Sequence, residues 1–146
     1  MISLLTLACV SLLCVSCNPE PMSVHDVEGE YNGKLEAEIG GAPAGVVNSA
    51  VHTVITSPDN RGLAIAFENL KVVSYNLGSF VVNCGVEYDE KAGAFNLYGE
   101  PQVVFAEYGK LPVKVSGAAD NGIITLGLDI ESLNLKMTYT GFKKNK

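Results

Sequence analysis

The side chains suited to acid–base, nucleophilic or metal chemistry are few in this chain. His25 and His52 are the only histidines among 146 residues. A metal site built from several histidines is therefore excluded, and a Ser-His-Asp triad would have to use one of these two. His52 lies on the more polar side of an alternating segment, and His25 lies in a segment without alternation. We expect both to be solvent-exposed and neither to be catalytic.

Glu30, Glu36 and Glu38 form a row of carboxylates in the segment 28–39. Paired carboxylates can perform acid–base catalysis when they lie in a concave, partly desolvated site. Successive side chains of a strand point to opposite faces, so the even spacing of these three places them on one wet face. The chain also lacks a glycine-rich phosphate loop between a strand and a helix. We expect no enzymatic activity, no catalytic residue, no metal and no cofactor.

The four cysteines do not form a disulfide framework. Cys9, Cys14 and Cys17 lie in or beside an N-terminal apolar segment, which leaves Cys84 alone in the body of the chain. A lone cysteine cannot bridge within its own chain, although a bridge between two copies or a reactive thiol stays open. Cys84 shares its parity with apolar neighbours, so core packing as a small hydrophobe is the favoured interpretation.

Residues 1–16 form an uncharged, apolar run that is too short for a permanent membrane span, which needs about 20 residues. Its length is typical of a signal peptide. The sequence Leu-Cys-Val-Ser-Cys that ends at Cys17 resembles a bacterial lipobox, in which the cysteine after a small residue is lipidated. The resemblance implies that acyl chains on Cys17 anchor the protein to a membrane of the cell envelope, with the outer membrane as the expected location. Residues 17–27, broken by two prolines, are then expected to form a tether before a domain at 28–144.

Short segments of alternating polarity, joined by turns, indicate an all-β domain. Successive hairpins favour a small antiparallel up-and-down barrel of about eight strands, with a β-sandwich as the alternative. The sequence Asp120-Asn121-Gly122 predicts a hairpin with a type I′ turn. Residues 71–78 are expected to form either an irregular strand or a loop. Strands are expected at 28–39, 46–56, 63–67, 79–88, 94–98, 102–107, 111–117, 124–130 and 133–140.

The inward parity of these strands provides a largely apolar lining. An eight-stranded barrel is just wide enough to be filled by side chains or to hold one small ligand. The many large inward residues predict a mostly filled interior, and any ligand that enters is expected to be small and hydrophobic, with the inward tyrosines as hydrogen-bonding groups. The candidate ligand-lining residues are Tyr31, Phe67, Phe80, Tyr88, Phe105, Met137 and Tyr139.

The sequence from Gly29 to Leu35 follows the pattern Gly-x-Tyr-x-Gly-x-Leu. This pattern resembles the opening of the calycin-like β-barrel lipoproteins of Gram-negative gut bacteria. The Asn121-Gly122 hairpin and the closing segment 137–143 are also similar to that family, and the likeness covers about 27–144. It implies a lipocalin-related barrel, but brings no settled activity and no catalytic residues.

The formal net charge of −6 argues against nucleic acid as a partner, because phosphate binding needs a surplus of Lys and Arg. Two functions remain. The first is a membrane-anchored lipoprotein whose barrel binds a small hydrophobic ligand. The second is an accessory or structural lipoprotein with a filled barrel that presents its loops to a protein or glycan partner.

Overall fold

The alternation of β1 (Gly29–Ile39) establishes the wall of a barrel. Tyr31 and Leu35 are fully buried, whereas Glu30 and Glu36 are exposed on the other face. This strand pairs antiparallel with β2 (Ala42–Thr56) on one side and with β10 (Leu135–Lys143) on the other. The first and last strands of the described chain therefore lie side by side, and no open edge remains at this seam.

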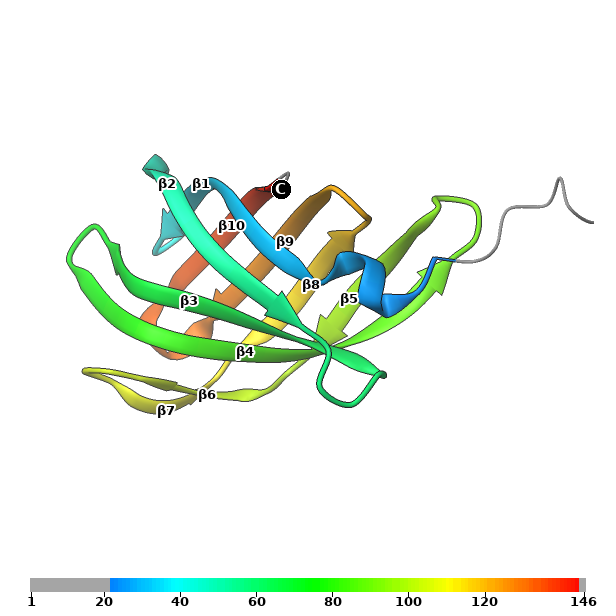
Figure 1. The fold of residues 1–146 in the computed structure, drawn as a ribbon. Helices are drawn as coiled ribbons and strands as arrows, with labels where there is room; N and C mark the ends of the chain where they lie inside the picture. The colour runs from blue at the N-terminus through cyan, green and yellow to red at the C-terminus, as the bar shows by residue number, and fades with distance from the viewer. Residues whose placement is uncertain (1–21, 145–146) are drawn as a thin grey trace, which may run out of the picture.

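The computed structural model describes residues 22–144 and shows a closed antiparallel barrel of eight strands in the order β1-β10-β9-β8-β5-β4-β3-β2 (Figure 1). The predicted up-and-down barrel is confirmed, and closure excludes the sandwich alternative. The architecture is compatible with a calycin-like fold. The expected signal peptide, Cys17 and the first part of the tether lie outside the described residues. The remaining elements are β3 (Gly62–Val72), β4 (Tyr75–Asp89), β5 (Ala94–Gly99), β6 (Gln102–Phe105), β7 (Gly109–Pro112), β8 (Lys114–Ala119) and β9 (Ile123–Ile130), with 3-10 helices η1 (Val24–Val27) and η2 (Glu131–Leu133).

Two glycines allow β1 and β10 to approach closely. Gly33 faces Gly141 in the register, and a Cβ on Gly33 would lie 1.8 Å from the carbonyl oxygen of Thr140. A Cβ on Gly141 would lie 2.6 Å from the ring of Tyr139. The second glycine therefore leaves room for that ring, which is fully buried inside the barrel.

The segments 102–107 and 111–117 were predicted as barrel strands, but most of their residues form a hairpin outside the barrel sheet. β6 and β7 pair only with each other and form a separate two-stranded sheet. They lie between β5 and β8 in the sequence, but not in the barrel. The chain leaves β7 at Pro112 and enters the barrel only at Lys114. Between them, the Val113 amide donates to the carbonyl of Pro101 and closes the base of the hairpin. Alternation shows which face of a strand is apolar, but it does not show which sheet the strand joins.

The last residues of the predicted tether form the 3-10 helix η1. Ser23 caps η1 in a capping box with Asp26, and Val27 is fully buried against the barrel. The capping arrangement satisfies backbone amides that would otherwise be free at the helix start. η1 therefore packs against the barrel through Val27.

Two predicted turns differ in detail. The β8–β9 hairpin occurs at the predicted place, but neither Asn121 nor Gly122 has the positive φ of a type I′ turn. The Asp120 carboxylate instead accepts hydrogen bonds from the amides of Gly122 and Ile123, as in an Asx-turn. The ambiguous stretch 71–78 holds the tight β3–β4 turn, with Val73 at a φ of 53°.

Replacement of Gly33 by alanine is expected to destabilise the fold by about 3 kcal/mol or more, because the new methyl group meets backbone of β10 rather than a movable side chain. Gly122→Ala is the matched control, since the nearest atom to its Cβ is 3.8 Å away and its φ is not positive. Urea unfolding followed by circular dichroism measures both. Equal stabilities for the two variants would contradict the close approach at the seam.

Candidate functional site

The predicted ligand-lining residues gather inside the barrel, as their parity required. Tyr88 differs from the rest, because it is only half-buried and packs edge-on against Phe95 with ring centroids 5.2 Å apart. The six others are buried in one hydrophobic cluster: Tyr31, Phe67, Phe80, Phe105, Met137 and Tyr139.

Aromatic rings occupy the middle of the interior. Phe67 stacks on Phe80 with centroids 4.9 Å apart, and Tyr139 meets Phe67 edge-on at 5.5 Å. Phe105 meets Phe80 edge-on, with centroids 4.9 Å apart. Rings at these separations are in direct contact. The interior is therefore filled by side chains, and the hollows described for residues 22–144 lie on the outer wall and rims.

Two of the three inward tyrosines already use their hydroxyl groups. Tyr31 donates to the carbonyl of Val27 at 2.7 Å, and Tyr139 donates to that of Val51 at 3.0 Å while it lies 3.2 Å from the Thr53 hydroxyl. Burial raises the pKa of Tyr31 to about 12 and also raises the pKa of Tyr139. These two hydroxyls fix the barrel wall, so the expected role of hydrogen-bonding a ligand does not fit their contacts.

The β6–β7 hairpin completes the wall next to this cluster. β5 pairs with β4 only between Gly85 and Asp89, so the first half of β4 has no ladder partner on that side. The hairpin lies beside β4 and covers this gap (Figure 1), and its Phe105 contacts Phe80 of β4. One backbone hydrogen bond, from Ala106 to Leu77 at 3.2 Å, joins it to β4. Its side-chain contacts with β4 include a 3.1 Å hydrogen bond from Asn76 to Glu107 and the packing of Tyr108 against Tyr75, with ring centroids 6.2 Å apart.

His25, Glu28 and Ser57 form a cluster that sequence reasoning missed. Nδ1 of His25 lies 2.6 Å from one carboxylate oxygen of Glu28, and the other oxygen accepts from the Ser57 amide at 2.8 Å. The Ser57 hydroxyl donates to the carbonyl of Gly62, so it is not positioned by a base as a nucleophile would be. The cluster fastens η1 to the β2–β3 turn. Its only sequence signal was the capping pattern Ser23-x-x-Asp26.

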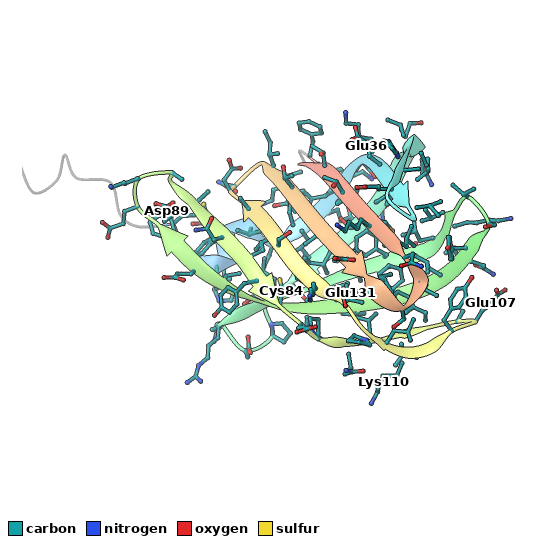
Figure 2. The ribbon with its side chains drawn as sticks, turned by 180° about the vertical axis from the view of Figure 1, so that it is seen from behind. Glu36, Cys84, Asp89, Glu107, Lys110 and Glu131 are labelled. Carbon is teal, nitrogen blue, oxygen red and sulfur yellow. The ribbon has the colours of Figure 1, made fainter. Side chains whose placement is uncertain are left out.

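The predicted carboxylate row lies on the outer wall, as expected. Glu36 is exposed (Figure 2) and pairs with Lys34 at 3.2 Å. Glu30 lies 3.6 Å from Nε2 of His52. Within residues 22–144, no three His, Cys, Asp or Glu side chains gather as they would around a metal ion.

Cys84 is buried, which confirms the prediction that it packs in the core. Desolvation raises the pKa of its thiol to about 11. The nucleophile of cysteine chemistry is the thiolate, which this environment disfavours. Cys84 therefore acts as a small core residue.

Comparison of this chain with protein-family models, curated proteins and solved structures finds no match. The barrel itself establishes the fold class, and the likeness to the calycin-like lipoproteins stays a prediction. The helices within the described range are all too short or too polar to cross a bilayer.

The pairing of His25 with Glu28 raises the pKa of the imidazole above 6.5 and lowers the pKa of the carboxyl below 4.5. The histidine therefore adds stability below about pH 6.5 and loses that contribution as pH rises through its folded pKa. The carboxylate adds stability above about pH 4.5 and loses it as pH falls through its own folded pKa.

We expect an NMR titration of the His25 ring to show a pKa above 6.5, and Glu28→Gln to lower it. Glutamine keeps an oxygen for the Ser57 amide but removes the charge. His52→Gln assigns the second histidine signal. A His25 pKa that Glu28→Gln leaves unchanged would contradict the assigned pair.

Proposed function

We propose that this chain is a non-enzymatic, lipid-anchored barrel protein of the cell envelope, whose filled barrel is a rigid support for surfaces that meet a protein or glycan partner. The filled interior is the observation that supports this function best. A ligand pocket has a volume of about 300–1,000 Å³. The aromatic contacts of Phe67, Phe80, Phe105 and Tyr139 occupy the space that such a pocket would need.

The outer wall offers a surface suited to a polar partner. A groove of about 530 Å³ runs across β8, β9, β10 and β1. Four side chains of alternating charge cross it in register, namely Lys114, Asp129, Lys136 and Glu38. Small side chains form the neighbouring row, in which Gly127 faces Ser116. Alternating charges of this kind favour specific, complementary polar contacts over a purely apolar interface.

An exposed aromatic ring continues that row. Tyr98 is the register partner of Ser116, and the position of a Cβ on Gly85 lies 2.5 to 2.8 Å from three atoms of the Tyr98 ring end. Those nearly equal distances place the ring face-on over Gly85, with its other face open to solvent. Tyrosine combines an apolar face with a polar tip, which suits protein and glycan surfaces alike.

Replacement of Cys17 by alanine is expected to abolish incorporation of labelled palmitate and to release the protein from membranes, because the acyl chains provide the anchor. Wild-type cells treated with a cross-linker should yield a conjugate that is much weaker with Cys17→Ala, since anchoring concentrates the protein beside its partner. Cys14→Ala is the matched control and should keep the label. Label retained by Cys17→Ala would refute the anchor, and the absence of any conjugate from wild-type cells would count against the partner.

A second function, carriage of a small hydrophobic ligand, draws support from the β6–β7 hairpin. The hairpin carries Phe105 into the aromatic cluster, yet one backbone hydrogen bond joins it to β4. Segments with few hydrogen bonds to their surroundings open at low free-energy cost. Displacement of the hairpin would uncover the ring of Phe80, which Phe105 contacts.

The filled barrel predicts that native mass spectrometry of the lipoprotein, extracted gently from membranes, shows the acylated chain without additional bound mass. It also predicts no rise in melting temperature with a panel of fatty acids, phospholipids and haem, because a ligand that bound the folded state would stabilise it. A detergent-only sample is the control. A bound species, or a concentration-dependent rise in melting temperature, would favour the carrier function instead.

A further inference from the structure

The proposed anchor places one end of the barrel close to the membrane. Cys17 and Met22 are five residues apart in the sequence, and a fully extended chain of that length spans at most about 18 Å. The end of the barrel that carries η1 therefore cannot move far from lipids that hold the acyl chains of Cys17. This inference rests on the proposed lipidation.

η1 is fixed to that end of the barrel by several contacts. Val27 is fully buried, and its carbonyl accepts the hydrogen bond of Tyr31. Nζ of Lys143, the last residue of β10, donates to the carbonyl of Asp26 at 2.8 Å and to the side chain of Asn121 at 3.1 Å. We call this end, formed by η1, the turns 57–61, 90–93 and 120–122 and the end of β10, the tethered rim.

Two large apolar side chains are exposed on the outer face of the tethered rim. Phe142 is 55% exposed and Ile123 is 44% exposed, and they are register partners on β10 and β9. Phe142 directly precedes Lys143, which touches η1. Within residues 22–144, Phe142 and Ile123 are the one pair of exposed large apolar residues that face each other on adjacent strands.

We propose that the tethered rim rests on the membrane surface, with Phe142 and Ile123 inserted among the lipids at the bilayer interface. Burial of two apolar side chains is too little to hold a soluble protein on a membrane, but a short tether makes the second contact intramolecular and raises its effective concentration. Aromatic residues are also favoured at the level of the lipid headgroups. The contact orients the barrel with its opposite rim away from the bilayer.

Charge contributes little to this contact. Lys143 and Lys144 lie at the tethered rim, but so do Glu28, Glu30 and Asp120. Attraction to anionic lipid needs a local surplus of basic side chains. Apolar burial is therefore the driving force, and zwitterionic vesicles suffice for the test.

The opposite rim supplies a matched control position. Val73, at the β3–β4 turn, is 56% exposed, almost the same as Phe142. β4 runs from that turn to Asp89 through 15 residues, which at about 3.3 Å per residue covers roughly 45 Å along the strand. Figure 2 shows Asp89 at one end of the barrel and Glu107 at the other.

The chain contains no tryptophan, so a single introduced tryptophan reports its own surroundings. The test uses lipidated full-length Phe142→Trp and Val73→Trp, each reconstituted into phosphatidylcholine vesicles with or without bromine atoms on the acyl chains. We expect the Phe142→Trp emission to shift to shorter wavelength and to lose at least half its intensity in brominated vesicles. The Val73→Trp emission should change little. Ile123→Trp is a second reporter and should behave like Phe142→Trp.

Circular dichroism confirms that each variant is folded, and vesicle flotation confirms that it is anchored. Anchored variants with equal quenching at both rims, or with none at Phe142→Trp and Ile123→Trp, would overturn the orientation while the anchor stands. Failure to float would refute the anchor and the orientation with it.

Discussion

The barrel depends on the close approach of β1 and β10. This seam is narrow because Gly33 faces Gly141, and the same absence of side chains admits the Tyr139 ring. The Tyr139 hydroxyl then reaches Val51 on β2, the strand on the far side of β1. One buried side chain thus ties together three neighbouring strands, and a hydrogen bond shielded from water is costly to break. Gly33 and Gly141 therefore allow both the closure of the barrel wall and the placement of the Tyr139 ring in the interior.

The wall is less uniform away from the seam. β4 is much longer than β5, and the hairpin β6–β7 covers the difference by packing rather than by a continuous hydrogen-bonded ladder. Phe105 is consequently both a wall residue and a core residue. Packing of this kind is stabilising because apolar surface leaves water, but it gives the hairpin fewer directional bonds than any barrel strand. A rigid seam and a loosely bonded hairpin thus lie on opposite sides of one core.

Period-two alternation predicted the barrel and most of its interior, because burial of one face constrains every strand of a closed sheet in the same way. It failed at 102–117, where Phe105 is buried as predicted but lies on a hairpin that does not belong to the barrel sheet. The sheet that a strand joins depends on hydrogen-bond partners that are distant in the sequence. The alternation of polar and apolar residues carries no information about those partners. The partner of the Tyr139 hydroxyl, the carbonyl of Val51, was unpredictable for the same reason. η1 was different, because the capping pattern Ser23-x-x-Asp26 can be recognised in the sequence. It lies next to the prolines on which the prediction of a tether was based.

The seam also determines the order in which the chain can fold. Tyr31 pairs with Lys143 and Ile39 with Leu135, so the wall joins the two extremes of the described sequence. Contacts between distant residues form late, because ordering the intervening chain costs entropy before they are made. A chain synthesised from its N-terminus therefore has one edge of β1 unpaired until β10 has formed. Such edges invite association with other chains, so association through β1 is expected of chains that lack β10 and not of the closed barrel.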